Sequence, residues 1–235
     1  MSAKRKYPLI LGIGGVAVVA ALLFVYFGIL SNDSPGEFSL ERGSTENTAA
    51  APPAGELAGT WTIAGGEAGY RVREKLANLP AQSDAVGRTS AVTGQVTISE
   101  EGGAYRANNA NFTVDVSKLK SNEDRRDNKI RTIGLETDKY PQATFAVAGP
   151  IDIPQDAIDG KVTTVQAEGD MTLHGVTKKV SIPLQVQRNG DQIRIVGNYD
   201  FAWDDFAMTA PSVAGFVSVT GNPKLEFDVT MSKQT

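Results

Sequence analysis

Cysteine is absent from this sequence of 235 residues, and His174 is its single histidine. The lack of cysteine excludes disulfides, thiolate nucleophiles, zinc ribbons and thiolate-held iron–sulfur clusters. A metal site would have to rest on carboxylates around one imidazole, and a nucleophile–histidine relay has at most one candidate base. The composition therefore disfavours most familiar catalytic and metal sites, and we expect a protein that is not an enzyme and has no metal.

Long runs of basic residues are also absent. The chain has 23 Lys and Arg residues against 27 Asp and Glu residues, and 41% of its residues are hydrophobic, as in ordinary globular proteins. When Lys4, Arg5 and Lys6 are set aside, the remainder carries a net charge of −7. Nucleic acid is therefore not expected as a partner, and adhesion to an anionic membrane surface is not favoured.

One long apolar run predicts a membrane anchor. Residues 9–30 are 22 consecutive uncharged positions, which as a helix rise about 33 Å and can cross a bilayer core. Basic residues precede the run and acidic residues follow it, so the positive-inside rule places residues 1–8 in the cytoplasm and the rest of the chain outside. The run is longer than the core of a cleaved signal peptide. We expect an uncleaved single-pass anchor, although processing near 48–51 stays open.

The chain after the anchor divides into two parts. Residues 31–56 are rich in Ser, Asn, Thr, Gly, Ala and Pro with scattered charges, which is typical of a flexible linker. Residues 57–235 form the predicted folded domain. The expected organisation is a cytoplasmic tail, a transmembrane anchor, a linker and one extracytoplasmic domain at the cell membrane.

Alternating apolar residues in this domain predict β-strands. Within 162–173, Val165, Ala167, Met171 and Leu173 share one parity and polar residues occupy the other. The other apolar stretches that indicate strands are 61–63, 70–72, 92–98, 112–116, 144–147, 180–186, 193–203 and 225–231. Turn signals occur at 101–103, 174–175, 189–191 and 221–223.

The spacing of these stretches favours antiparallel hairpins, because no set of crossover helices fits between them. About eight strands with one apolar face can close into a barrel or stack as a sandwich, and the residues alone leave both open. Pro183 predicts a bulge, a strand end or an edge. Ser121, followed by acidic residues and a charged run to Arg131, predicts a short helix with Ser121 as its N-cap. Taken alone, such a run is typical of a solvated helix face.

Four stretches resemble the YceI-like family. They are 126–130 (RDNKI), 139–145 (KYPQATF), 169–180 (GDMTLHGVTKKV) and 205–208 (DFAM), and the resemblance extends from about residue 59 to the C-terminus. It implies a lipocalin-like antiparallel barrel whose apolar interior carries a polyisoprenoid chain, in a secreted or periplasmic bacterial protein. An Asp…His-Ser pattern common in the family is missing before Tyr70, which indicates a variant subgroup. Glu67, Arg71 and Arg73 are the candidates to replace that imidazole.

The candidate site residues follow from parity and from these motifs. The apolar parity predicts a ligand tunnel lined by Val114, Phe145, Met171, Leu173, Ile182, Leu184, Ile195, Phe201 and Phe227. Arg126, Asp127 and His174 are candidates for a lid or mouth, with the helix held by hydrogen bonds of Asp127. For His174 the alternative, a structural role in its turn, is favoured, and haem is not expected. Asp204 and Asp205 are adjacent in sequence and would point to opposite faces of a strand, so they do not form an acid–base pair.

The sequence therefore predicts a membrane-tethered lipid-binding protein. We expect it to sequester or transport a polyisoprenoid, of the quinone or polyprenyl type, inside an all-β barrel of about eight strands with a short helical insertion, preceded by one transmembrane helix. Its expected partners are the isoprenoid and, through residues 9–30, the membrane, and no cofactor is expected. The alternative is a structural or interaction module with a filled core and no ligand, and a hydrolase is the third hypothesis.

Overall fold

The computed structural model describes residues 34–40, 57–76, 82–213 and 217–234. The predicted membrane span lies outside these residues. Within them, no helix has the length and apolarity needed to cross a bilayer. The residues from Gly36 onward form one unit by their contacts.

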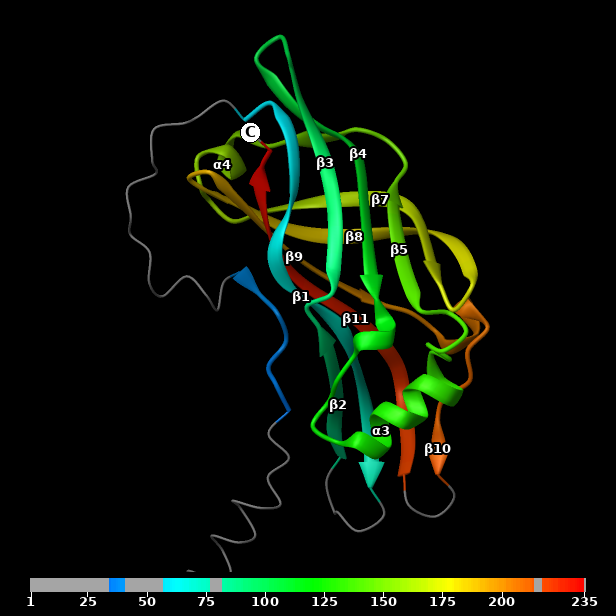
Figure 1. The fold of residues 1–235 in the computed structure, drawn as a ribbon. Coiled ribbons are helices and arrows are strands. Elements are labelled where there is room, and N and C mark those ends of the chain that lie inside the picture. Colours follow the sequence, from blue (N-terminus) through cyan, green and yellow to red (C-terminus); the bar gives the residue numbers. More distant parts are fainter. Residues whose placement is uncertain (1–33, 41–56, 77–81, 214–216, 235) are drawn as a thin grey trace, which may run out of the picture. The chain divides into compact units, whose positions relative to one another are not determined.

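This unit consists mainly of antiparallel strands joined by short loops and helices (Figure 1). The strands are β1 (Gly59–Leu76), β2 (Gln82–Thr89), β3 (Val92–Glu101), β4 (Ala104–Asp115), β5 (Gln142–Val147), β6 (Ile151–Ile153), β7 (Thr163–Leu173), β8 (Val176–Asn189), β9 (Gln192–Asp200), β10 (Ser212–Val213) and β11 (Val217–Lys233). The helices are η2 (Val116–Lys118), α3 (Asp124–Lys129), η3 (Ile130–Gly134), α4 (Gln155–Ile158) and η4 (Trp203–Phe206).

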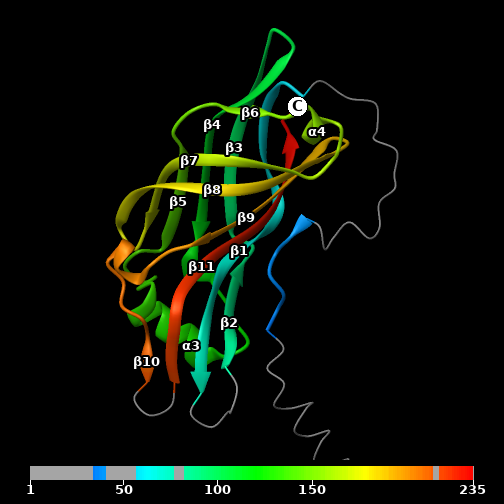
Figure 2. The same cartoon turned by 180° about the vertical axis from the view of Figure 1, so that it is seen from behind.

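Eight strands close a ring. Pairing runs through β1, β3, β4, β5, β7, β8, β9 and β11, and β11 pairs back with β1 along nearly its full length. Both views show β1 and β11 side by side (Figures 1 and 2). β2, β6 and β10 are attached to this ring without being part of the circuit. The predicted antiparallel barrel is confirmed, and of the two architectures that the residues left open, the sandwich is excluded.

Strand parity sets the inside and outside of the barrel. On β7, Ala167, Met171 and Leu173 are buried, while Glu168 and Asp170 between them are exposed. The same alternation holds on β8, where Val180, Ile182 and Leu184 are buried. Successive side chains of a strand point to opposite faces, so the predicted apolar parity forms the core of the barrel.

Three of the four predicted turns are confirmed, and the one at 221–223 is wrong. β11 continues through these residues: Thr220 pairs with Arg73, and Lys224 pairs with Arg71, so the extra residues form a bulge. Gly221 has φ of 81°, a conformation that glycine adopts without strain. The bulge allows β11 to remain paired with β1 on both sides of Pro223.

The predicted helical insertion is confirmed, but its N-cap is not Ser121. Glu123 caps α3, because its carboxylate accepts a hydrogen bond from Arg125 N at 3.3 Å. Ser121 precedes the cap, and its hydroxyl accepts from Glu123 N at 3.2 Å. Pro183 lies at a local edge, as predicted: it pairs with Gln166 of β7, whereas pairing of β8 with β9 begins one residue later.

Candidate functional site: two apolar cavities inside the barrel

Two apolar cavities lie in the barrel interior. The α3-side cavity has a volume of about 110 Å³, and the α4-side cavity has a volume of about 80 Å³. The two linings share Phe112, Leu184 and Ile195. The cavities are therefore neighbours in one core, and these three side chains form the wall between them.

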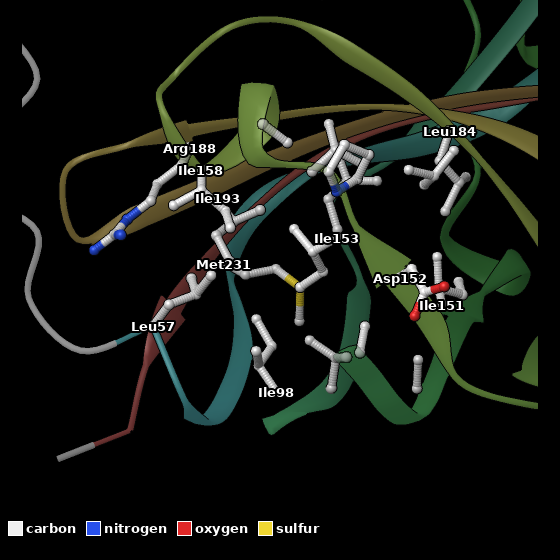
Figure 3. A pocket seen from close by; sticks show the side chains of 18 of the residues that line it. Leu57, Ile98, Ile151, Asp152, Ile153, Ile158, Leu184, Arg188, Ile193 and Met231 are labelled. Carbon is white, nitrogen blue, oxygen red and sulfur yellow. The ribbon is translucent and has the colours of Figure 1, made fainter. Parts of the chain in front are cut away.

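The α4-side cavity is lined mainly by aliphatic residues, which include residues from the beginning and the end of the barrel domain. Leu57, Ile153 and Met231 face each other in Figure 3, and α4 contributes Ile158. The charged residues of this lining have partners elsewhere: Asp152 accepts from Arg106 at 2.9 Å, and Arg188 Nε donates to a backbone carbonyl at 3.0 Å. A ligand inside this cavity would therefore contact almost only apolar atoms.

The α3-side cavity is closed by the segment that carries α3. Val116, Leu119 and Leu135 of this segment belong to the cavity wall, together with inward residues of the barrel strands. Glu226 also borders the cavity, but its carboxylate binds Arg71 and Arg88. Apolar walls with very few polar groups are typical of sites that bind hydrophobic ligands.

Eight of the nine predicted tunnel residues line the α3-side cavity. They are Val114, Phe145, Met171, Leu173, Ile182, Leu184, Ile195 and Phe227. The ninth, Phe201, lies outside both linings and packs edge-on against Phe206, with ring centroids 5.3 Å apart. Phe201 follows the end of β9, so strand parity no longer directs it into the cavity. The part of these residues in binding a ligand stays a prediction.

Other lining residues were missed. Leu119 and Leu135 come from the segment outside the sheet, where no alternation marks them, whereas Val116 continues the predicted parity of Val114. Tyr70 shares the parity of Val72 on β1, and this parity is the signal that marks it as a lining residue. The α4-side cavity was predicted only in part: Leu184 and Ile195 line it, whereas β6 and α4 are too short to carry a periodic pattern.

The predicted polar mouth is divided into two separate clusters. His174, in the turn between β7 and β8 with φ of 50°, contacts Phe206 O through Nδ1 at 3.0 Å and Glu136 through Nε2 at 2.6 Å. Its ring packs edge-on against Tyr140, with centroids 4.6 Å apart. Both ring nitrogens are engaged, which agrees with the structural role. The backbone that His174 contacts belongs to η4 and not to its own turn.

Arg126 and Asp127 differ from the prediction in how they hold the helix. The guanidinium of Arg126 forms an ion pair with Glu74, which is 4% exposed and lies on the inward parity of β1. Asp127 Oδ1 accepts only local hydrogen bonds, from Ser121 N at 2.9 Å and Ser121 Oγ at 2.7 Å. Arg126, and not Asp127, therefore fastens α3 to the barrel. The physical reason is reach, because the longer side chain spans the gap to the strand.

Tyr70 lies at the α3 end of the cavity. It is 6% exposed, and its ring lies against Gly87 of the paired strand β2, where an added Cβ would come within 2.3 Å of the ring. Burial raises the pKa of the Tyr70 hydroxyl well above its usual range, with smaller opposing effects of Arg126 and Asp127. The hydroxyl is therefore protonated, and Ser121 is among the groups that interact with it.

Of the three candidates to replace the missing family histidine, only Arg71 is buried, and it lies outside the barrel. Arg71 and Arg88 both bind the carboxylate of Glu226, which is 0% exposed. Residues 36–40, which we call the strap, cover this cluster: Arg88 donates to Gly36 O at 2.7 Å and lies 3.8 Å from the ring centroid of Phe38. These charges support the outer wall, and only Glu226 among them borders the cavity, with its carboxylate bound by the two arginines.

The comparisons with known proteins identify a family. Residues 61–231 match the YceI-like domain. Protein YceI of Escherichia coli O17:K52:H18 is 34% identical over 99 residues, which cover 42% of this chain and 47% of that protein. The UPF0312 protein VPA0850 of Vibrio parahaemolyticus is 29% identical over 182 residues, covering 77% and 83%. The chain thus spans about half the length of the Escherichia coli relative that it matches.

Two solved structures share the fold. A polyisoprenoid binding domain from Saccharophagus degradans, described as implicated in plant cell wall breakdown, has a TM-score of 0.50 and 16% identity, covering 73% of this chain and 99% of that one. BcnA of Burkholderia cenocepacia has a TM-score of 0.50 and 18% identity, covering 69% and 95%. At these identities the likeness concerns the fold.

Proposed function

We propose that this chain, which belongs to the YceI-like family, binds an isoprenoid lipid of the quinone or polyprenyl type inside its barrel. The observation that carries the proposal is the pair of apolar cavities that share Phe112, Leu184 and Ile195. An apolar chain that displaces these side chains slightly can extend from one cavity into the other. Burial of such a chain contributes about 0.8 kcal/mol per methylene, so it can bind without any specific chemistry.

The name of one neighbour supports this assignment. The Saccharophagus degradans domain with the same fold is described as polyisoprenoid binding. We propose the corresponding role for this chain, to sequester or transport the lipid, and the proposal includes no catalytic step. Specificity would come from the length of the chain and from a small number of polar groups at its end.

The test is to extract the purified full chain with organic solvent and to analyse the extract by mass spectrometry. We expect an isoprenoid in near-stoichiometric amount. A soluble globular protein of similar size, purified from the same cells in the same detergent, controls for lipid carried over from the membrane. An extract that matches this control, together with failure of the delipidated chain to take up added isoprenoid, would favour the filled-core alternative.

We also propose that residues 9–30 anchor the domain to the cell membrane and that the domain lies outside the cytoplasm. The support is the apolar run with basic residues before it and acidic residues after it. Protease added to intact spheroplasts should remove a C-terminal tag and leave an N-terminal tag protected. A protected C-terminal tag, with a known external protein cleaved in the same sample, would contradict this topology.

A further inference from the structure

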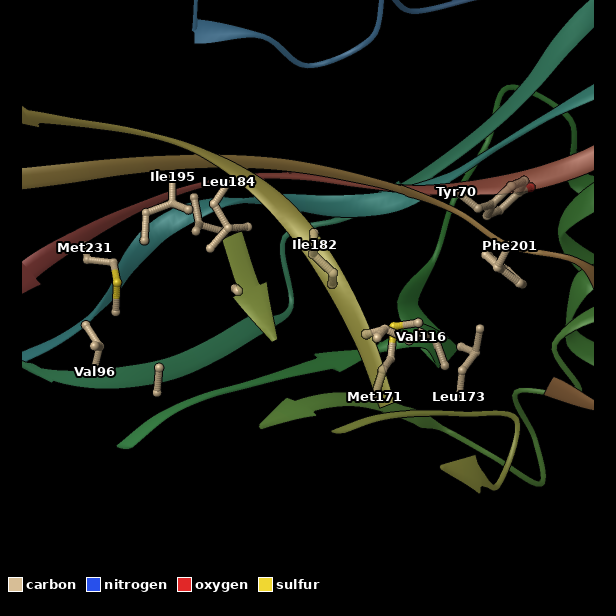
Figure 4. Packing of buried hydrophobic residues seen from close by; sticks show 14 of the residues in the cluster. Tyr70, Val96, Val116, Met171, Leu173, Ile182, Leu184, Ile195, Phe201 and Met231 are labelled. Carbon is tan, nitrogen blue, oxygen red and sulfur yellow. The ribbon is translucent and has the colours of Figure 1, made fainter. Parts of the chain in front are cut away.

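The strap begins at the α3 end of the barrel. Gly36, its first residue, accepts a hydrogen bond from Arg88 Nη2 at 2.7 Å. The backbone of Arg88 pairs in turn with Lys120, through N–O distances of 2.8 and 2.9 Å, and Lys120 lies four residues before α3. Figure 4 shows the buried cluster extending from Met231 to Tyr70, and Tyr70 pairs with the residue that precedes Arg88. The strap therefore starts at the Tyr70 end of the cluster, away from Met231.

The strap is fastened to the barrel at both of its ends. The ring of Phe38 lies 3.8 Å from the guanidinium carbon of Arg88, near the start of the strap. At the other end, Leu40 is 1% exposed, and its backbone N donates to Gln185 Oε1 at 3.0 Å. The strap is therefore held by the outer wall of the barrel, and the connection to the proposed anchor leaves the barrel at Gly36.

This position of Gly36 sets an upper limit on the distance between the barrel and the membrane. The proposed anchor ends at residue 30, and six residue steps separate that residue from Gly36. A chain extends by at most about 3.6 Å per residue, so these steps span roughly 20 Å at most. If the folded part began at Leu57, the connection could span roughly 95 Å. The strap therefore shortens the tether more than fourfold.

The short tether decides which end of the barrel can face the membrane. Arg88 pairs with Gly69, and β1 runs ten residues from Gly69 back to its start at Gly59. Gly59 pairs with Ile98, which lines the α4-side cavity. Ten strand residues extend roughly 30 Å, which exceeds the tether. A barrel with its α4 end on the membrane would hold Gly36 beyond the reach of the anchor, whereas a barrel with its α3 end there would not.

The segment that carries α3 is the basic part of an acidic domain. We call residues 116–140 the α3 insertion; it has seven Lys and Arg residues against five Asp and Glu residues, whereas the rest of 57–235 has twelve against seventeen. Arg125 and Lys129 are exposed and form no ion pair with another described residue. Ile133, 45% exposed, is the one large hydrophobic side chain that is exposed in the described part of the chain. Exposed bases and apolar side chains together favour binding to an anionic membrane surface.

The opposite end of the barrel is acidic. The strand ends and loops around α4 expose Glu100, Glu101, Asp152, Asp156, Asp159 and Asp191. Two exposed bases there, Arg106 and Lys161, are each paired with one of these acids. An anionic lipid surface repels this end and attracts the α3 insertion, which is also the orientation that the tether allows. The net negative charge of the chain hides this division, so composition alone does not predict the contact.

We propose that the α3 insertion is a membrane-contact surface, which the strap holds against the bilayer that carries residues 9–30. Its partner is the layer of anionic lipid head groups, and Ile133 enters the boundary between head groups and acyl chains. This inference rests on the proposed anchor and on the proposed lipid binding, and it specifies the route of the lipid. Because the α3 insertion closes the α3-side cavity, the lipid passes between the bilayer and that cavity.

The test places one fluorophore at each end of the barrel in the full chain, reconstituted into vesicles. Because the chain has no cysteine, Thr132→Cys and Glu100→Cys each provide a single labelling site, and both positions are exposed. The vesicles contain phosphatidylglycerol and a lipid with a nitroxide on its head group in both leaflets, so that either direction of insertion is reported. We expect the label at position 132 to lose most of its fluorescence and the label at position 100 to keep most of its fluorescence.

Release of the strap is the second measurement. Leu40→Asp places an unpaired charge in a buried position, so it should detach the strap while leaving the inward face of the barrel unchanged. The tether then lengthens, and we expect the difference between the two labels to disappear. Leu40→Met keeps an apolar side chain of similar volume, so this control should retain the difference. Circular dichroism on heating checks that the barrel of Leu40→Asp is folded.

The charge of the α3 insertion is tested without disturbing the strap. Arg125→Gln combined with Lys129→Gln removes two exposed charges, each of which strengthens attraction to an anionic surface by about fivefold. We expect quenching at position 132 to fall in this variant, and to fall in the unchanged protein when phosphatidylcholine replaces phosphatidylglycerol. Arg106→Gln combined with Lys161→Gln removes the same charge at the α4 end and should not lower quenching at position 132.

The outcomes separate this inference from the proposals on which it rests. Equal quenching of the two labels, or stronger quenching at position 100, in protein that floats with the vesicles would overturn the membrane contact and leave the anchor and lipid binding intact. An undiminished difference in Leu40→Asp would overturn the role of the strap. Protein that does not float with the vesicles would refute the anchor, and an extract without isoprenoid would refute lipid binding whatever the quenching shows.

Discussion

Leu184→Trp separates a ligand cavity from a filled core. Leu184 is 7% exposed and belongs to the linings of both cavities. On one side it is tightly packed, since a Cβ added to Gly197 of β9 would lie 3.0 Å from its Cδ2. On its other sides it borders the two spaces of about 110 and 80 Å³. An indole at this position has room only where a ligand would otherwise lie.

The two interpretations predict different losses of stability for Leu184→Trp. If the spaces are effectively filled, the larger ring overpacks the core and costs about 1–3 kcal/mol, which for a domain of this size lowers the Tm by roughly 2–10 °C. If they are open, the indole enters them, the Tm of the delipidated protein changes little, and the amount of bound isoprenoid falls. Leu184→Trp is therefore expected to lose lipid while keeping its thermal transition.

The assay pairs thermal unfolding, followed by circular dichroism on delipidated protein, with mass spectrometry of the lipid extract. Ile133→Trp is the control, because Ile133 on η3 is 45% exposed and the same ring added there fills no cavity. A clear loss of Tm in Leu184→Trp with undiminished lipid recovery would refute the reasoning, since it would show that lipid and side chain do not compete for the same space.

Three further substitutions test the wall, the glycine contact and the helix. Glu226→Gln should destabilise the protein by about 3 kcal/mol in urea unfolding, because it leaves two guanidiniums with a neutral partner in a buried site; a change below about 1 kcal/mol would mean that water reaches the cluster. Gly87→Ala should cost about 1–3 kcal/mol by forcing the Tyr70 ring to move, whereas Gly65→Ala, with no atom within 4 Å of the added Cβ, should cost less. Asp127→Asn keeps an oxygen that can accept from Ser121, so the free energy of unfolding should change by about 0–1 kcal/mol. The exchange rate of a fluorescent isoprenoid analogue should stay the same. A clear change in this rate without a matching loss of stability would show that the charge of Asp127 controls lipid access.

The parts of the fold that could be predicted are those with a regular pattern. β7, β8 and β9 alternate over most of their length, with Val196 of β9 as a buried exception on the other parity, so their existence and their inward faces followed from the sequence. β1 and β11 were predicted in pieces, because small residues at 64–69 and the Gly-Asn-Pro at 221–223 interrupt the apolar pattern. These two long strands pair with each other despite the weak apolar pattern in those stretches. The pairing depends on closure of the ring, so neither segment alone predicts it.

The sequence predicted lining residues of the site only on strands, where alternation shows which side chains face inward. Eight tunnel residues line one cavity, yet the contacts that fasten α3 beside it depend on which groups Ser121 and Arg126 bind. Those partners come from a strand and a helix about fifty residues apart in sequence, and no local pattern encodes their geometry. The cluster around Glu226 was missed for a related reason: charged residues on the polar parity of a strand normally face water, and burial here requires the strap.

The strap determines where the folding unit begins. Leu40 is 1% exposed and bonds through its backbone N to Gln185 at 3.0 Å, and Glu37 reaches Lys224 at 2.9 Å. A shortened protein that starts at Leu57, where the predicted folded domain starts, would contain every strand of the barrel and still expose Glu226 and its arginines to water. We therefore expect a fragment that begins at Gly36, twenty-one residues before Leu57, to be more stable than one that begins at Leu57, because only the longer fragment keeps the strap over Glu226.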